Sequence, residues 1–295
     1  MPSLEIHPLS ELRGEAADLL EERFTRQRAA EPLLPAVDDF EAHLPAEGHV
    51  ATRGGTAVAY LGGAVDGDMA RWLFAGHAAR EPEALRDLFA LQAEQLAVSR
   101  FMLTVPASDP ELVDVWFRLA FGCQAVWAVK EVEPFEAEFD GAIRPAEPDD
   151  VDELFVFDEI LYEHQQATPS FSGFPTPPAA DLRAEWDDVW EDDKFVPFVA
   201  ERDGAIVGLL GLYRRPEGDL RVPENNIDLA FAATRDEVRG SGAGLALTAH
   251  GMSWAAENGF DSMTVDWRSV NLLSSRFWPR RGFRPQYLRL YRAVP

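Results

Sequence analysis

The chain has 295 residues, and because an average domain takes about 150, the length alone predicts two domains. Hydrophobic residues make up 46% and charged residues 26%, which is ordinary globular usage and excludes a disordered or fibrous chain. The 27 lysines and arginines are outnumbered by 51 aspartates and glutamates, which gives a formal net charge of -24. This negative charge repels phosphate backbones and anionic lipids, so we expect neither nucleic acid nor a membrane as a partner.

Cysteine usage and the start of the chain favour a cytoplasmic protein. Cys123 is the single cysteine, so it cannot form a disulfide within the chain or a cluster of thiolate ligands. The first residues lack the basic flank and apolar core of an export signal. The longest apolar run, residues 204–213, is far shorter than the roughly 20 residues of a membrane helix. Because no His, Cys, Asp and Glu residues have the spacing of metal ligands, we expect no metal.

Short sequence echoes predict that the chain contains two copies of one fold. They recur in the same order in both halves: residues 6–8 and 143–145, residues 53–55 and 202–204, and residues 116–121 and 278–283. The order of the elements supports the repeat, whereas the sequence identity is low. A single mixed domain with coincidental echoes is therefore the alternative. We expect the boundary near Asp140, with one domain over residues 1–140 and the other over residues 141–295.

The elements expected in the second half define an α+β domain. Branched and aromatic residues predict three strands joined by turns, and an apolar stripe then predicts a helix that stops at Gly259. The expected ranges are strands at 195–201, 205–213 and 227–234, a helix at 242–258, a strand at 262–267, a helix at 271–281 and a strand at 287–292. We therefore predict two tandem α+β domains, each with a mixed, mostly antiparallel sheet flanked by helices.

The segment 239–244, Arg-Gly-Ser-Gly-Ala-Gly, lies between the third strand and the long helix. Its glycines permit positive φ and close approach of the backbone, and the first amides of the helix have no intrahelical partner. Such a loop commonly holds a phosphate or pyrophosphate. A flexible turn is the alternative. The glycine spacing and the antiparallel strands disfavour a dinucleotide fold, and the missing Lys-Ser/Thr excludes a P-loop.

With its context, this segment resembles the GNAT superfamily of acetyl-coenzyme A dependent N-acyltransferases. The family signature is Arg or Gln, two residues, Gly, one residue, then Gly or Ala, and Arg239, Gly242 and Gly244 fit it. A second family element occurs at the later helix, with the residues Asn271, Ser274, Phe277, Trp278, Gly282 and Phe283. The resemblance covers roughly residues 227–292, and weaker agreement extends back to Ile143.

The resemblance implies acetyl-CoA, or another acyl-CoA, as the cofactor. The amides of the glycine segment would bind its pyrophosphate, Asn271 would hydrogen-bond the pantetheine arm, and the strand at Ala233 and Thr234 would offer backbone groups to the thioester. The implied coenzyme-binding residues are Ala233, Thr234, Arg239, Gly240, Ser241, Gly242, Ala243, Gly244 and Asn271.

Asp228 is the candidate general base, because one branch of the family places a glutamate 11 positions before the signature arginine. A carboxylate here could take a proton from an amine, directly or through water. The alternative is that Asp228 only pairs with an arginine or caps the turn at 225–226. The tyrosine that serves many members as general acid is replaced by Trp278, so a water, Tyr213, Tyr287 or no acid at all would serve the leaving thiolate.

The charge distribution suggests a cationic acceptor. Residues 141–204 hold 17 acids and 4 bases, whereas residues 205–295 hold 9 acids and 12 bases. The connection 164–194 interleaves Phe171, Phe174 and two tryptophans with acids that include Glu191, and an aromatic, acidic lid of this kind suits an organic cation. The alternative for this connection is a solvated surface helix. The alternative for His164 is a purely structural role. The candidate substrate-binding residues are Tyr162, His164, Trp186 and Trp190.

The first copy has lost the coenzyme motif. His77, Arg80 and Pro82 stand where the repeat aligns the signature arginine and glycines, and Asp109 aligns with the asparagine. Proline and arginine obstruct the approach of a phosphate to the backbone. We therefore expect this copy to bind no coenzyme and to support the second one, as a wall of the acceptor cleft.

We predict an enzyme that transfers acetyl from acetyl-CoA to a primary amine of a small cationic molecule, by direct attack in a ternary complex. Two alternatives stay open, namely a protein or peptide N-acetyltransferase and a non-catalytic acyl-CoA sensor. The abundance of arginine and alanine indicates a bacterial source, and a monomer or homodimer is expected.

Overall fold

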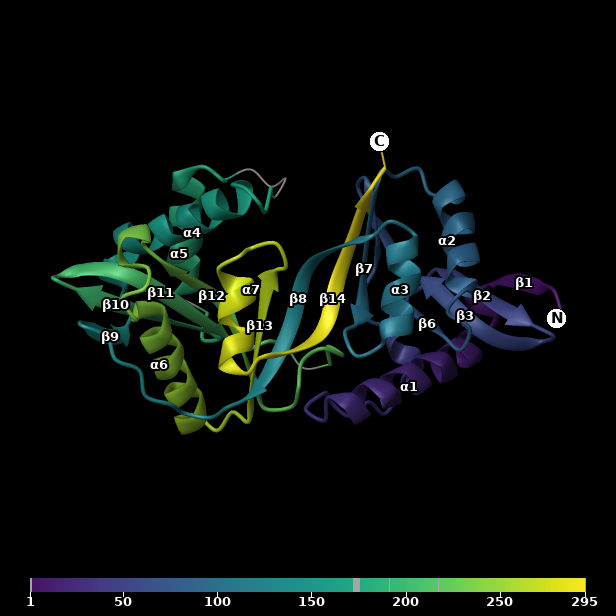
Figure 1. Cartoon of the computed structure of the whole chain (residues 1–295), viewed down its shortest axis with the longest axis horizontal. Coiled ribbons are helices and arrows are strands. Elements are labelled where there is room, and N and C mark those ends of the chain that lie inside the picture. The colour runs from purple at the N-terminus through teal and green to yellow at the C-terminus, as the bar shows by residue number, and fades with distance from the viewer. Residues whose placement is uncertain (1, 172–175, 191, 217, 295) are drawn as a thin grey trace. The chain divides into compact units, whose positions relative to one another are not determined.

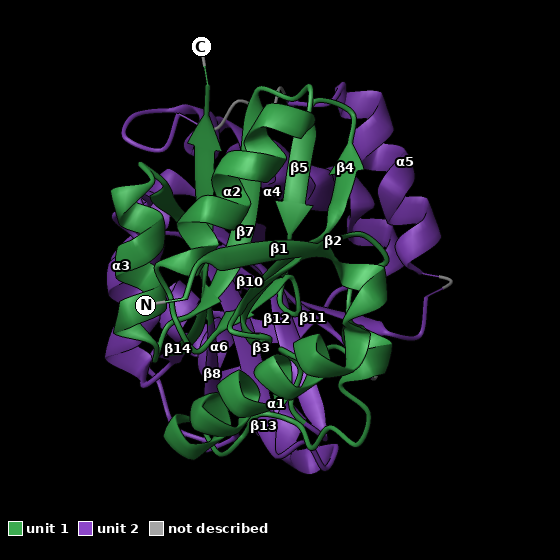
Figure 2. Ribbon diagram, turned by 90° about the vertical axis from the view of Figure 1, so that its right-hand side faces the viewer, with its two compact units in different colours: residues 1–127, 219–223, 285–295 green, residues 128–218, 224–284 purple. Residues whose placement is uncertain are grey.

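The computed structural model describes residues 2–171, 176–190, 192–216 and 218–294. The chain forms two compact units, with residues 1–127, 219–223 and 285–295 in unit 1 and residues 128–218 and 224–284 in unit 2 (Figure 2). The expected ranges were 1–140 and 141–295, whereas residues 128–140 belong to unit 2, and residues 219–223 and 285–295 belong to unit 1. No helix in the described ranges is long and apolar enough to cross a membrane.

Unit 1 contains two groups of hydrogen-bonded strands and the helices that cover them (Figure 1). One sheet has the order β1 (Leu4–Pro8), β2 (Gly48–Arg53), β3 (Thr56–Gly62) and β6 (His77–Ala79). The second group has the order β4 (Ala64–Asp66), β5 (Met69–Trp72), β7 (Arg100–Pro106) and β14 (Arg284–Ala293). The helices are α1 (Arg13–Ala30), α2 (Ala84–Gln95) and α3 (Pro110–Arg118), and β8 (Gly122–Glu131) leads from unit 1 into unit 2.

The C-terminal strand β14 is held in unit 1 by pairing and by burial. It runs antiparallel to β7, from Tyr287 opposite Pro106 to Ala293 opposite Arg100. Leu290 and Tyr287 are fully buried, and each belongs to a different apolar core of this unit. The hydrophobic contacts of these two side chains therefore place β14 in unit 1, whereas its sequence indicates only that the segment is a strand.

Unit 2 is built on a mixed sheet between helices (Figure 1). Its strands, from one edge inward, are β9 (Ala142–Pro145), β10 (Phe195–Arg202), β11 (Ala205–Tyr213), β12 (Asn226–Thr234) and β13 (Ser262–Arg268). Neighbouring strands are antiparallel except β12 and β13, which are parallel. The helices are α4 (Val151–Gln166), α5 (Ala179–Val189), α6 (Ala243–Glu257) and α7 (Ser274–Phe277).

The faces of the β11 strand explain how the helices are placed. Leu209 lies in an apolar core with Val151, Leu154 and Phe157 of α4. The neighbouring residue Leu210 points toward the other face, where Gly251 of α6 leaves room for it. Because side chains alternate along a strand, this fully apolar strand is covered on both faces.

The predicted α+β fold with sheets flanked by helices is confirmed, and the expected strands of the second half agree closely with β10 to β14. The helix expected over 271–281 is shorter, because Pro279 ends α7 and starts a 3-10 turn at Pro279–Arg281.

Candidate functional site

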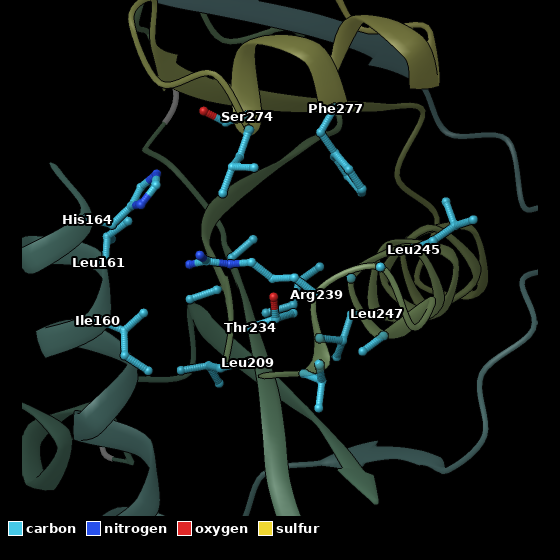
Figure 3. Close-up of a pocket in the computed structure, with 18 of the residues that line it drawn as sticks. Ile160, Leu161, His164, Leu209, Thr234, Arg239, Leu245, Leu247, Ser274 and Phe277 are labelled. Atoms are coloured by element: carbon cyan, nitrogen blue, oxygen red, sulfur yellow. The ribbon is translucent and has the colours of Figure 1, made fainter. Parts of the chain in front are cut away.

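Unit 2 contains a pocket of about 510 Å³ (Figure 3). Residues of α4 line one side, the middle of β11 and the end of β12 line its floor, and the glycine segment with the start of α6 lines another side. The fourth side is the stretch from Asn271 through α7 to Arg281. Most of the lining side chains are aliphatic or aromatic, so the pocket suits a long, largely apolar ligand with charged groups at one end.

The pocket opens where two parallel strands separate. Pairing of β12 with β13 covers Asn226 to Leu229 of β12 only, although that strand continues to Thr234. The register with β11 shifts at the same place, so that Gly211 pairs with Phe231 and Leu212 with Leu229. The bulge bends β12, and among the described residues its last ones have no pairing partner on the β13 side. Ala233 and Thr234 lie on this edge and line the pocket, as does Ala232.

The glycine segment presents main-chain amides to the pocket. Gly240 and Gly242 have positive φ values of 84° and 95°, and Gly242 is the N-cap of α6. Ala246 donates its amide to the carbonyl of Gly242, so the amides of the preceding first turn lie outside the helical ladder. An added Cβ on Gly242 would lie 2.5 Å from the backbone oxygen of Glu138, so glycine is needed here for both φ and space.

Two arginines line the pocket. The Arg239 side chain extends into it (Figure 3), and its Nη2 lies 2.6 Å from Oδ1 of Asp236. The Arg281 guanidinium stacks 3.7 Å from the ring centroid of Phe277 and donates to that residue's carbonyl. Burial, with the neighbouring charge of Arg280, lowers the pKa of Arg281. With the positive end of the α6 dipole, these cations favour an anionic ligand group.

Asn271 lies at the junction between α4 and α7. Its Oδ1 accepts hydrogen bonds from the amides of Leu273 at 3.0 Å and Ser274 at 3.3 Å, which caps the start of α7. His164 of α4 also contacts this oxygen, with Nε2 at 3.1 Å. Both side chains line the pocket, so the structure brings together a predicted coenzyme residue and a predicted substrate residue.

Asp228 is buried on β12 and is not among the residues that line the pocket. Its Oδ2 lies 2.5 Å from Nη2 of Arg215, and its Oδ1 accepts a hydrogen bond of 2.7 Å from the hydroxyl of Thr264. The same hydroxyl accepts from the amide of Asn226. The arginine pairing that was the alternative interpretation is therefore present, and both carboxylate oxygens have partners.

Trp186 was expected in an aromatic lid over the substrate, but the structure buries it in an apolar core. This side chain is 4% exposed and packs in the apolar core between α4 and α5, and its indole donates to Oδ2 of Asp158 at 2.7 Å. Trp190 packs on it at 6.0 Å between centroids. Neither tryptophan lines the pocket, because the apolar face of α5 is used to cover α4. Phe174 and Glu191 lie outside the described residues.

The remaining predicted residues have mixed positions. Gly240, Ala243 and Gly244 line the pocket, whereas Ser241 is exposed next to them and Tyr162 is half-buried on α4. The sequence analysis missed Ile160 and Leu161, and only the helical spacing from His164 could have indicated them.

The structure also locates Trp278, at the position of the family's general acid, and Tyr287, one of the candidates to replace it. Trp278 is 6% exposed, lines the pocket and contacts Phe277 and Phe283 edge-on. Tyr287 is buried in a core of unit 1, and burial raises its pKa to about 12. Within the part of the chain that the structure describes, no group of His, Cys, Asp and Glu is arranged to hold a metal ion.

Comparison with known proteins agrees with this site. Residues 158–283 match the model of the acetyltransferase (GNAT) family, and this range includes the whole pocket. A search of curated proteins found no match.

Solved structures give the same fold over almost the full chain. A GCN5-related N-acetyltransferase from Sphaerobacter thermophilus is 13% identical, with a TM-score of 0.60 over 99% of this chain and 96% of that one. An acetyltransferase of the GNAT family from Colwellia psychrerythraea is 12% identical, with a TM-score of 0.54 over 99% and 100%. A tandem GNAT protein from the clavulanic acid biosynthesis pathway is 14% identical, with a TM-score of 0.52 over 99% of both chains.

The separated strands, the amide-lined helix start and the matched family model together define a GNAT acetyltransferase domain in this chain. This domain agrees with the resemblance in the sequence, which implied acyl-CoA-dependent N-acetyl transfer.

Proposed function

We propose that unit 2 binds acetyl-CoA in the 510 Å³ pocket and transfers the acetyl group to a primary amine of a small cationic molecule. The observation that carries this proposal is the position of the glycine segment 239–244, whose amides and positive helix end line one side of a largely apolar pocket. Pyrophosphate is the coenzyme group that such a cradle fits.

The lining residues fit the rest of the coenzyme. Arg239 and Arg281 would neutralise its phosphates. An ion pair with Asp236 positions the first guanidinium, and stacking on Phe277 positions the second. The unpaired edge of β12 at Ala233 and Thr234 offers backbone donors and acceptors to the amides of the pantetheine arm. Asn271 would contribute a further polar group along the same path.

The coenzyme supplies the activated acyl group as a thioester. The amine nitrogen of the acceptor would form the new bond to the carbonyl carbon, and the carbon–sulfur bond would break. The thiolate would leave with that electron pair and take up the proton that the nitrogen loses. Because a free thiol has a pKa of about 8.5, the thiolate can leave without a general acid. The indole of Trp278 therefore does not prevent the reaction at the position where many family members have tyrosine.

Asp228 is our candidate for the group that takes the proton from the acceptor ammonium. It lies on β12 beside Leu229, the last residue that pairs with β13, and so at the closed end of the gap between these strands. Because Arg215 and Thr264 already occupy its oxygens, a bridging water would carry the proton. His164 lines the pocket and is the other candidate for this base. Substitution of each residue in turn distinguishes the two.

A cationic acceptor is supported by the acids of the first half of unit 2. The stretch 141–204 carries 17 acids against 4 bases, and it includes α4 and α5. Such a field attracts cations and repels anionic acceptors. Trp186 is no part of this argument, since it is buried.

We assign unit 1 a supporting role without coenzyme binding. His77 is fully buried between β6 and β7, with Nε2 2.9 Å from the carbonyl of Thr104 and its ring against Trp116.

The test is a calorimetric titration of the full chain with acetyl-CoA, followed by an acetylation screen with release of free thiol as the readout. We expect one coenzyme site per chain and turnover with polyamines or aminoglycosides. Turnover only with peptides would favour a protein N-acetyltransferase, and coenzyme binding without any turnover would favour a sensor. A chain that does not bind acetyl-CoA would refute the proposed pocket.

A further inference from the structure

A second pocket, of about 400 Å³, lies within unit 1. It is formed by α1, the segment after β6, and the turn that leads from β7 into α3. The polar and charged residues in its lining are Arg23, Arg26, Gln27, Arg80, Ser108 and Glu111, together with Asp109 at the helix start. The volume is within the range of small-molecule sites, which starts at about 300 Å³.

Arg23 gives this pocket a buried positive charge. Its side chain is 1% exposed, and it donates to the backbone oxygens of His77 and, at 2.6 Å, Phe74. Its Nε has no hydrogen-bond partner, and within the described ranges no carboxylate pairs with it. Because buried charges are normally paired, a guanidinium in this state calls for an anion.

Gln27 lies one turn further along α1 and provides an acceptor. It is 2% exposed, and its amide nitrogen donates to the backbone oxygen of Gln286 at 3.4 Å. Its Oε1 is buried without a partner. Nearly all buried polar atoms are hydrogen-bonded, so two such atoms on adjacent turns of one helix indicate a ligand with complementary groups.

The other charges restrict the anion to a small monovalent one. Arg80 is already paired with Glu22, and Nη2 of Arg26 lies 3.8 Å from Oδ2 of Asp109. The other oxygen of Asp109 accepts from the amide of Leu112 and caps α3. The negative charges of Asp109 and Glu111 would repel a phosphate dianion more strongly than a ligand with a single carboxylate.

We propose that unit 1 binds a small monocarboxylate that carries a hydrogen-bond donor next to the carboxylate, namely an α-hydroxy or α-amino acid. The ligand carboxylate lies at Arg23 and Arg26, and the adjacent hydroxyl or ammonium donates to Oε1 of Gln27. An ammonium in this place is also stabilised by Asp109 and Glu111.

The probes are lactate, L-alanine, propionate and inorganic phosphate, titrated against the full chain with saturation-transfer NMR. Propionate lacks only the donor, so we expect lactate or L-alanine to bind at least about fivefold more tightly, the effect of one hydrogen bond of about 1 kcal/mol. Arg26→Gln should weaken binding at least about fivefold, and because the Arg26 side chain is 55% exposed, this variant should fold. Arg86→Gln removes an exposed arginine of the same unit outside the pocket, and it should bind as the wild type does.

Three results would overturn the assignment. The first is that neither lactate nor L-alanine binds. The second is that Arg26→Gln and Arg86→Gln bind the ligand equally well. The third is that phosphate or propionate binds as tightly as lactate and L-alanine, which would refute the ligand class.

Discussion

The substitution Gly242→Ala tests whether the amides at the start of α6 hold the coenzyme. The added Cβ would lie 2.5 Å from the backbone oxygen of Glu138, and the residue would have to keep a φ of 95°. A left-handed alanine costs about 1–2 kcal/mol, and relief of the contact must move the backbone. If the movement removes two amide hydrogen bonds to the pyrophosphate, each worth at least about 1.5 kcal/mol, the loss is about 3 kcal/mol, or about 150-fold in affinity.

Gly259→Ala is the matched control. Gly259 has a φ of 79° after the end of the same helix, and an added Cβ would meet nothing within 4 Å. We expect this variant to lose about 1 kcal/mol of unfolding free energy and to keep its affinity for acetyl-CoA. Calorimetric titration and urea denaturation of both variants separate the two effects. If Gly242→Ala binds acetyl-CoA as tightly as Gly259→Ala, the amide cradle is refuted.

Three further substitutions have defined outcomes. Asp228→Asn should lower kcat by about 10²- to 10⁴-fold and leave the Kd for acetyl-CoA unchanged. If His164→Gln, and not Asp228→Asn, abolishes the pH dependence of kcat, His164 is the base. Arg281→Gln should raise the Kd for acetyl-CoA about tenfold in titrations at low salt, and Arg280→Gln, outside the pocket lining, should not; equal effects would contradict a phosphate contact. Burial raises the pKa of Asp158 from 3.8 to about 6, so the wild type should lose about 2–3 kcal/mol of unfolding free energy relative to Asp158→Asn as pH rises from 4 to 7. Urea denaturation at both pH values measures this loss, and a constant difference would show that folding does not raise the pKa of this carboxyl.

The sign of the Asp158 effect follows from the direction of the shift. The unfolded chain releases this proton near pH 3.8, whereas the folded chain retains it up to about pH 6. The stabilisation is therefore complete below pH 3.8 and is lost as pH rises through the folded-state pKa. Because Trp186 donates to the same carboxyl, Asn at this position keeps an acceptor for the indole.

The coenzyme site was the part most accessible to sequence analysis. Segment 239–244 and Asn271 are defined by local chemistry, since glycine φ preference, helix-start amides and spacing along the chain are properties of short segments. All of these residues except Ser241 line one pocket, and their role in coenzyme binding stays a prediction. The acceptor side was less accessible, because Trp186 in an acidic helix has the same sequence pattern whether it faces solvent or α4.

The sequence by itself determined the classes of the elements, the positions of β10 to β13 and the motif that places the chain among acetyltransferases, because each depends on local periodicity and spacing. Only the tertiary structure decided that β14 pairs with β7 in unit 1, that Arg215 reaches Asp228 and that Arg23 is buried without a carboxylate partner among the described residues. These features depend on contacts between residues far apart in the chain, and the free energy of such contacts depends on burial that no single segment specifies.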